Sequence, residues 1–457
     1  MTETSATSAN SSAPVTLAAR PKVFPPRPYV FPEVRTVAVG AGRVVAAHLP
    51  GQPIAWLSVL LDGGALHEPA GLDGLAKATA GLLDEGTLKR SADDFGTAVE
   101  SLGGSWSVDT GWETARISLD LPIREAAAGA DLLAEAVRTP AFTDTDVERY
   151  LSDLVAAKRE SFARPGPRAQ LALRSALYGA DSRFGRLTGG DPESVAALDA
   201  EAVRAFHATW LRHAGTLLIA GDLDRLDVEA LGRTVFGDFP ASTATRPAAP
   251  VALSQPPRLT IADRPGAVQS TLRIGHPTVT RAEAAQHGID VVALRIAATI
   301  LGGTFTSRVN HELREVKGYT YGAHAGFDLG RPVGLFSFSA EVRTDATANA
   351  VADTLRVIDE YLDGGATSVE LEKTRAYLTG ATPIGLQTAG AVGSRLVEMV
   401  RHGLPTDYVT TEHARMLEVT LDEANAAVRA ALRPEQLVVA VEGDASVVGG
   451  PLEALNL

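Results

Sequence analysis

Hydrophobic and polar residues alternate in several short segments of the chain, which is the pattern of half-buried β-strands. The segments Ala55–Asp62, Thr114–Leu121 and Leu335–Val342 show this alternation. Two other segments, Val147–Phe162 and Glu370–Leu378, space their apolar residues as an amphipathic helix does. In each half, predicted strands come first, long helices follow, and a last strand ends the half. This order predicts an α+β fold with helices packed on one face of a mostly antiparallel sheet.

Two landmarks recur at the same distance along the chain, which indicates that its halves are homologous domains. Thr145 and Thr367 each begin a Thr-x-x-Glu capping box before a helical pattern, and they are 222 residues apart. Short apolar strands end at Asp222 and Asp444, which are again 222 residues apart. Two independent landmarks with one offset favour duplication over coincidence.

A proline-rich stretch separates the two halves. Residues 240–257 contain five prolines and little periodic hydrophobicity, which suits an extended connector. The first thirty or so residues are rich in Ser, Thr, Ala and Pro, as flexible tails are. We therefore expect a tail at 1–31, an N-terminal domain at 32–239, a linker at 240–257 and a C-terminal domain at 258–457.

The composition excludes several kinds of site and partner. The chain has no cysteine, which excludes disulfides, thiolate metal ligands and cysteine nucleophiles. Its net charge of −13 argues against a nucleic-acid or anionic-membrane partner. No apolar run is long enough to cross a bilayer, and no secretion signal is recognisable, so we expect a cytoplasmic protein.

The most specific sequence motif is the segment Ile300–Asp328, which reads ILGGTFTSRVNHELREVKGYTYGAHAGFD. It resembles the signature of the pitrilysin and mitochondrial-processing-peptidase family: a leucine, two glycines, Ser-Arg-hydrophobic, Leu-Arg-Glu, a glycine and a tyrosine. The flanking segments Ile261–Ser270 and Arg331–Asp345 fit the same pattern. The resemblance extends from about residue 32 to the end of the chain.

Active members of that family carry His-x-x-Glu-His on a helix of the N-terminal domain. The two histidines share one helix face and hold zinc, and the glutamate activates the metal-bound water. The resemblance aligns Gly74–Thr87 with this motif, and it puts Lys77, Ala80 and Gly81 where His, Glu and His belong. The family's third ligand, a glutamate, falls at Ala157. No His-x-x-Glu-His occurs elsewhere, so we expect no metal or cofactor in this chain and no peptidase activity from it alone.

The resemblance implies a catalytic role for Arg314 and Tyr321, seven residues apart in the C-terminal half. In active members the matching arginine and tyrosine contact the substrate at the zinc of the opposing domain. A tyrosine hydroxyl there stabilises an oxyanion, and the forked donors of arginine hold the peptide.

The residue pattern alone permits a purely structural interpretation of this segment. Val309, Leu313 and Val316 would form an apolar helix face, with Gly318 ending the helix. The arginine would then be a solvated helix residue and the tyrosine a strand aromatic.

Taken together, the sequence favours a non-catalytic subunit of a heteromeric zinc metallopeptidase. The expected partner is a homologous subunit that carries the zinc motif and the zinc, and the substrate is an extended peptide. The segment Ser105–Thr110 occupies the place where family members add the substrate as an extra strand, although an ordinary edge strand explains it equally well. The alternatives are a scaffold subunit, or a peptide-binding relative, with no part in proteolysis.

Overall fold

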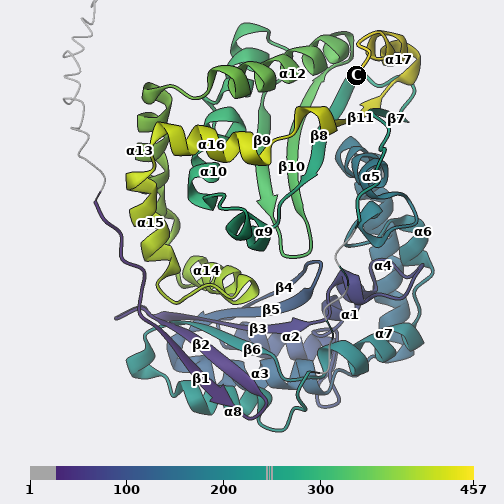
Figure 1. The fold of residues 1–457 in the computed structure, drawn as a ribbon. Coiled ribbons are helices and arrows are strands. Elements are labelled where there is room, and N and C mark those ends of the chain that lie inside the picture. The colour runs from purple at the N-terminus through teal and green to yellow at the C-terminus, as the bar shows by residue number, and fades with distance from the viewer. Residues whose placement is uncertain (1–26, 243–244, 246–247, 249–250) are drawn as a thin grey trace, which may run out of the picture.

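The computed structural model describes residues 27–242, 245, 248 and 251–457, which form two sheet-and-helix units. In Figure 1 the N-terminal unit lies at the bottom and the C-terminal unit above it. The helices α4 and α5 join the two units on one side, and α14 and α15 join them on the other. None of the helices in the described part is long and apolar enough to span a bilayer.

The N-terminal sheet has six strands in the order β1-β2-β6-β3-β5-β4. Their bounds are Val34–Val39 (β1), Gly42–His48 (β2), Ile54–Asp62 (β3), Ser105–Thr110 (β4), Thr114–Pro122 (β5) and Thr216–Gly221 (β6). All neighbouring strands are antiparallel except β2 and β6. The strand β4 therefore lies at one edge of the sheet.

The C-terminal sheet has five strands in the order β7-β11-β8-β10-β9. Their bounds are Leu259–Asp263 (β7), Gln269–Thr278 (β8), Ala323–Leu329 (β9), Gly334–Arg343 (β10) and Val438–Gly443 (β11). In this sheet the pair β7 and β11 is parallel, as β2 and β6 are in the other sheet, and the remaining neighbours are antiparallel. Five consecutive strands of each sheet thus share one order and one set of directions, which confirms the two homologous α+β domains.

The helices of the N-terminal half cover mainly one face of its sheet. They are Leu75–Gly81 (α1), Ala92–Ser101 (α2), Ala126–Arg138 (α3), Asp144–Ala163 (α4), Pro165–Tyr178 (α5), Pro192–Ala196 (α6), Ala200–Phe206 (α7) and Val228–Phe236 (α8). The main core lies between the sheet and α1, α2, α3 and α8, where Leu75, Phe95, Leu133 and Val235 are buried.

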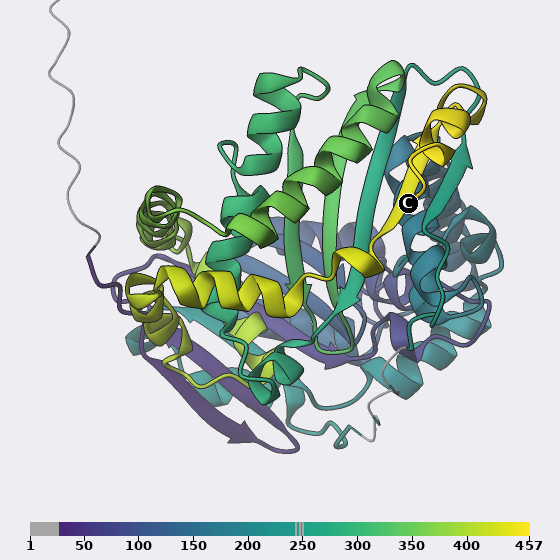
Figure 2. The same cartoon turned by 45° about the horizontal axis from the view of Figure 1, so that its top comes forward.

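The helices of the C-terminal half repeat this layout. They are Arg281–Gln286 (α9), Val291–Ala298 (α10), Arg308–Asn310 (α11), Thr347–Gly364 (α12), Ser368–Gly385 (α13), Ala389–His402 (α14), Tyr408–Glu418 (α15), Leu421–Ala431 (α16) and Ala445–Glu453 (α17). Figure 2 shows the green helix α12 and the yellow helix α16 lying across one face of the sheet.

Each half also contributes one helix to the sheet of the other half. The helix α5 packs on the C-terminal sheet, where Leu173 and Leu177 meet Val438 and Ala440 of β11. The helix α14 packs on the N-terminal sheet, where Val392 and Leu396 join a cluster that includes strand residues of β2, β3 and β6. The predicted helices on one face are thus present, and the other face receives a helix from the opposite half. This exchange explains why all six residues of β6 and of β11 are buried, since central strands covered on both faces become continuously apolar.

The contact between Trp56 of β3 and Gly393 of α14 is especially close. Trp56 is 3% exposed, and a Cβ added at Gly393 would lie 2.1 Å from its ring. Glycine at this position lets the helix backbone reach the face of the indole. The helix α14 therefore sits closer to the N-terminal sheet than a helix with any larger residue at 393 would.

The chain before β1 is tied to the C-terminal half. The amide of Tyr29 donates to His413 Nδ1 at 3.3 Å, and the amide of Phe31 donates to the hydroxyl of Thr410 at 3.0 Å. Phe31 is buried, although the predicted tail extended to residue 31. Residues 1–26 of that tail lie outside the described residues. In the predicted linker, the described residues between 240 and 257 form no helix or strand beyond an isolated bridge at Ala241.

The predicted capping boxes have different outcomes. Thr367 caps α13 as predicted, with the Thr367 hydroxyl accepting from the amide of Glu370. The box at Thr145 is wrong, because α4 begins two residues earlier and Thr143 is its N-cap. The Thr143 hydroxyl accepts from the amide of Asp146 and donates to its carboxylate, so an acidic residue three positions on serves this cap as well. The strands ending at Asp222 and Asp444 are as predicted, and both aspartates cap the turn or helix that follows.

Substituting Gly393 with alanine tests the helix exchange. The added methyl group would collide with the Trp56 ring, so we expect a loss of roughly 1–3 kcal/mol in the free energy of unfolding. The matched control is Gly380→Ala in α13, where an added Cβ meets nothing within 4 Å. That change should stabilise the protein by about 0.5–1 kcal/mol, since alanine favours helix. Denaturant unfolding measures both, and equal effects would contradict the close contact.

Two buried histidines predict an acid-sensitive fold. His276 Nε2 accepts from the amide of Arg433 at 3.1 Å, and Nδ1 donates to the Pro277 carbonyl at 2.8 Å. Burial lowers the pKa of His276 to about 4, and burial lowers that of His207 to about 4. The unfolded chain takes up protons at these rings as the pH falls through about 6.5, whereas the native chain does so only near 4. Stability is therefore present above pH 6.5 and is lost between 6.5 and 4, by up to about 3 kcal/mol per ring.

The check is urea unfolding of the full chain at pH 7, 6 and 5. A His276→Gln variant retains an acceptor for the Arg433 amide and cannot be protonated in this range. Its loss of stability between pH 7 and 5 should be smaller than that of the unmodified chain. An unchanged pH dependence would show that His276 titrates normally in the native state.

Candidate functional site

The segment aligned with the zinc motif forms α1, and a glycine lets this helix begin where it does. Gly74 precedes α1 with φ +98°, and a Cβ there would lie 2.8 Å from the Gly189 carbonyl oxygen. The carboxylate of Glu68 then caps the helix, accepting from the amides of Gly74 at 3.1 Å and Ala76 at 2.9 Å. Arg183 pairs with Glu68 at 2.6 Å. Burial raises the pKa of Glu68 to about 7 despite these partners.

The residues at the three motif positions differ sharply in their surroundings. Lys77 is exposed, whereas Ala80 is fully buried in the N-terminal core. At Gly81 a Cβ would lie 2.0 Å from the hydroxyl oxygen of Tyr150, which comes from α4. The space that a side chain at 81 needs is therefore filled by the tyrosine. Burial raises the pKa of Tyr150 to about 12, so the phenol keeps its proton at neutral pH.

Zinc does not fit this position. Lys77, Ala80, Gly81 and Ala157 offer no oxygen or imidazole ligand, and Tyr150 fills the space over Gly81. In the described part of the chain, one group of three His or acidic side chains is close enough to share a metal, namely His48, Asp222 and Asp224. That group lies at the ends of β2 and β6, and its atoms already accept from the amides of Gly51, Leu223 and Asp224.

A cavity of about 780 Å³ opens beside the zinc-motif positions Lys77 and Gly81. Lys77 of α1, Val108 and Asp109 of β4, and Tyr150 and Lys158 of α4 line it. The described structure does not place Ala157 in this lining, and its neighbour Lys158 faces the cavity instead. The Lys158 ammonium donates to the Gly190 carbonyl at 3.2 Å. Burial and the nearby charge of Lys77 lower the pKa of Lys158 to about 8.

On the C-terminal side, Tyr321 lies in the loop before β9 and is 92% exposed. It is therefore not the strand aromatic of the structural interpretation. Its loop is held at both ends: the amide of Tyr319 donates to the Leu313 carbonyl at 2.9 Å, and Asn310 bonds to both the amide and the carbonyl of Ala323. Thr320 closes the turn onto Gly322. The loop is thus well anchored, while the Tyr321 side chain forms no hydrogen bond or ring contact with the described residues.

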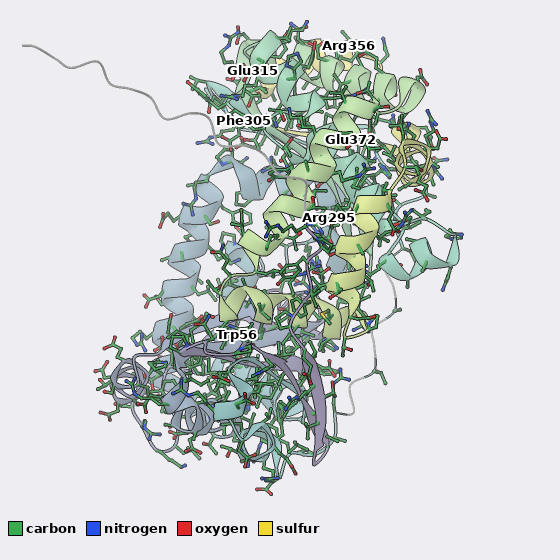
Figure 3. All side chains as sticks on the ribbon, turned by 90° about the vertical axis from the view of Figure 1, so that its left-hand side faces the viewer. Trp56, Arg295, Phe305, Glu315, Arg356 and Glu372 are labelled. Atoms are coloured by element: carbon green, nitrogen blue, oxygen red, sulfur yellow. The ribbon has the colours of Figure 1, made fainter. Side chains whose placement is uncertain are left out.

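Arg314 lies in the π-helical turn His311–Val316 and is partly buried. Its guanidinium stacks on the ring of Phe305 at 3.6 Å from the centroid and pairs with Glu315 at 2.9 Å. Figure 3 shows Phe305 and Glu315 near one another, at the end of the molecule away from Trp56. The structure thus holds this side chain against the protein surface rather than leaving it solvated.

The predicted apolar face of this helix is only partly correct. Val309 and Leu313 are fully buried, but Val316 is 58% exposed. The π-helical turn carries Val316 out of register with the other two, because its residues do not follow the α-helical period. Gly318 does follow the end of the helix with φ +63°, as predicted.

Several residues of the signature Ile300–Asp328 make contacts that stabilise the fold. Arg308 forks onto Glu370 at 2.7 and 2.8 Å and lies over the ring of Tyr361. This pair lowers the pKa of Glu370 to about 2, despite burial. Gly302 allows the backbone to reach β9, since a Cβ there would lie 2.4 Å from Ala325. Sequence reasoning missed Asn310, Tyr150 and Lys158, and only Asn310 offered a signal, as a polar residue on an otherwise apolar face.

The cavity beside Tyr321 and the cavity beside the zinc-motif positions are adjacent in space. The cavity of about 480 Å³ that contains Tyr321 and Phe305 shares Arg273 of β8 with the cavity that contains Lys77 and Lys158. Burial lowers the pKa of Arg273, whose side chain also comes close to Gly166 at the start of α5. The exchanged helix α5 therefore brings the two cavities to a common wall.

Both halves of this chain match models of one peptidase family. Residues 43–182 match the model described as insulinase, peptidase family M16, and residues 197–378 match the model described as the peptidase M16 inactive domain. An uncharacterized zinc protease of Mycobacterium tuberculosis is 29% identical over 412 residues, covering 86% of this chain and 90% of the relative. A non-peptidase homolog of Helicobacter pylori is 22% identical over 396 residues, covering 85% and 89%.

A solved structure of a peptidase M16 inactive domain from Pseudomonas fluorescens shares the fold, with a TM-score of 0.81 and 24% identity over 90% of this chain and 98% of that one. The chain belongs to peptidase family M16, as its resemblance to the pitrilysin and processing-peptidase family predicted. Within that family it is a member without the His-x-x-Glu-His motif.

A double-mutant cycle tests the packing of Tyr150 against Gly81. Gly81→Ala would ordinarily stabilise a helix by about 1 kcal/mol, but here the methyl group collides with the phenol, so we expect destabilisation of roughly 1–3 kcal/mol. In a Tyr150→Phe background the nearest atom recedes from 2.0 to 2.9 Å, so the cost of Gly81→Ala should fall. The measurement is the free energy of unfolding of all four proteins. An equal cost in both backgrounds would show that the hydroxyl does not occupy this space.

Proposed function

We propose that this chain is the non-catalytic subunit of a heteromeric zinc metallopeptidase and supplies Arg314 and Tyr321 to the zinc site of a homologous partner. The partner carries the His-x-x-Glu-His motif and the zinc ion. The substrate is an extended peptide, and the reaction is hydrolysis of an internal peptide bond. The assembly is expected in the cytoplasm.

One observation carries the proposal most strongly: the exposed tyrosine on an anchored loop. Tyr321 is 92% exposed, while hydrogen bonds fix the chain on both sides of it. An exposed aromatic ring gains little for the fold of its own chain. A hydroxyl held on a rigid loop can instead be presented to a second molecule, where it would stabilise an oxyanion. Arg314, stacked on Phe305, stands eight residues from that loop's end at Gly322 and offers further donors.

The second support is the state of the N-terminal half. The motif positions hold Lys77, Ala80 and Gly81, and Tyr150 closes the space over Gly81. In this proposal, the metal for peptide cleavage is held by the partner. The non-peptidase relative of Helicobacter pylori and the match to an inactive M16 domain agree with a non-catalytic role.

The edge strand β4 provides a place for an extended substrate. Among the described residues it pairs only with β5, and its residues Val108, Asp109 and Thr110 line the larger cavity. Main-chain donors and acceptors on its free side can pair with an added peptide strand. This geometry also favours the peptide-binding alternative, in which the chain holds peptides without any part in their cleavage.

Peptide cleavage by three preparations separates these functions: the chain alone, the chain with an M16 relative that carries the zinc motif, and that pair with Tyr321→Phe. The chain alone should be inert and the pair active. Loss of the Tyr321 hydroxyl should reduce kcat by at least roughly tenfold, because one oxyanion donor disappears. A matched control is Tyr377→Phe, which removes the hydroxyl of another exposed tyrosine, on α13, and should leave kcat unchanged.

Two results would count against a shared active site. In one, the zinc-bearing relative is as fast by itself as in the pair. In the other, Tyr321→Phe has no more effect than Tyr377→Phe. Either would leave the scaffold or peptide-binding functions as the better account of this chain.

A further inference from the structure

Two lysine side chains converge in the larger cavity at the place where the family's zinc motif would lie. A Cβ added at Gly189 would lie 2.8 Å from Lys158 Nζ and 3.2 Å from Lys77 Cδ, so both side chains pass beside the same glycine. Lys77 comes from α1 and Lys158 from α4, and both line the cavity. Two formal positive charges therefore stand where active relatives hold a divalent cation.

No carboxylate forms a salt bridge with either lysine in the described part of the chain, although the charges of Asp191 and Glu68 act on Lys158 in the opposite sense to Lys77. Among the described residues, neither lysine forms an ion pair, and the Lys158 ammonium has only the Gly190 carbonyl as partner. The nearest acidic groups are committed elsewhere: Glu68 to Arg183 and two amides, Asp191 to the amide of Ser194, and Asp109 to Arg116 at 3.6 Å. The third cation of the cavity, Arg273, also faces Glu341.

Two like charges held close together, one of them partly buried and neither in an ion pair, are costly for the folded protein. Burial and the charge of Lys77 already depress the pKa of Lys158 to about 8, which reflects this cost. An anion that entered the cavity would relieve the repulsion and gain charge-assisted hydrogen bonds from both ammonium groups. The polar lining of the cavity also includes Thr110, whose hydroxyl has no partner in the described part of the chain.

The position of the lysines indicates which anion fits. The cavity is bounded by the last residues of β4, Val108 to Thr110, and no other described strand pairs with the outer edge of β4. A peptide paired with that edge would bring its own end, or a side chain near it, to the lysines. The anionic groups of peptides are the terminal carboxylate and the side chains of aspartate and glutamate.

We infer that Lys77 and Lys158 form a carboxylate-binding site for extended peptides, in place of the family's metal site. The inference rests on the proposed function only in taking a peptide as the ligand. It requires neither a partner subunit nor cleavage, so the chain alone is sufficient to test it.

The experiment measures retention of acetylated hexapeptide pools by the full chain, by equilibrium dialysis and mass spectrometry at pH 7. In every pool, the randomised positions exclude Asp and Glu, so that any acidic group is the one introduced by design. One pool ends in a free carboxylate and its match in an amide. A second amidated pair carries either one Glu or one Gln at varied positions. We expect at least a tenfold preference for an acidic pool over its neutral match, and the two pairs distinguish a terminal from a side-chain carboxylate.

The variant Lys77→Met/Lys158→Met should reduce this preference to within twofold while retaining the neutral peptides. Because the two charges repel, the variant should be at least as stable as the unmodified chain. The control Lys89→Met/Lys373→Met removes two exposed lysines that do not line this cavity, and with them the same net charge. It should keep the preference.

The inference would be overturned by equal retention of acidic and neutral pools by the unmodified chain, by a preference that survives in Lys77→Met/Lys158→Met, or by a preference lost equally in the control. Absence of retention of any pool would overturn it as well. None of these bears on the activity of the two-subunit mixture, which is measured separately.

Discussion

The fold depends on the fact that neither sheet can bury both of its faces with helices from its own half. The inner strands β6 and β11 are buried at every residue, and in each case part of the covering comes from the opposite half. Hydrophobic burial is the main stabilising term in folding, so each half gains the rest of its core only when the other is folded beside it. The exchange of α5 and α14 therefore fixes the relative position of the two halves, and with it the position of the two cavities along Arg273.

The sequence predicted the elements better than their partners. Alternation along β5 and β10 and the helical spacing of α4 and α13 reflect local burial, which each segment records in its own residues. The strand at Ala55–Asp62 is present as β3, but the half-buried alternation predicted for it is wrong, because α14 covers its second face. The duplication was visible in the strands that end at Asp222 and Asp444, whereas the second landmark was misplaced: the caps Thr143 and Thr367 are 224 residues apart, not 222. Which sheet an amphipathic helix packs against is not recorded in its periodicity, so the exchange of α5 and α14 could not be predicted. The capping box at Thr145 was wrong because Thr143 offers an equivalent signal two residues earlier.

The candidate site shows the same division. The missing zinc motif and the positions of Arg314 and Tyr321 came from resemblance in sequence, and the family that the resemblance suggested is confirmed. The neighbours of these residues could not be predicted, because contacts such as Phe305 with Arg314 or Tyr150 with Gly81 depend on packing between distant segments. Val316 failed the predicted pattern because a π-helical turn shifts the residue phase by more than an α-helical period allows. The catalytic role of the Arg314 and Tyr321 pair stays a prediction.

The phenol over Gly81 has a consequence for descent. A mutation that restored histidine at this position would arrive in a space already filled, 2.0 Å from an oxygen at its first side-chain atom. It would cost stability before any metal could repay it, and it would do so while Lys77, Ala80 and Ala157 still lacked ligands. A histidine at 81 is therefore disfavoured for as long as Tyr150 is present, and a change at Tyr150 would have to come first.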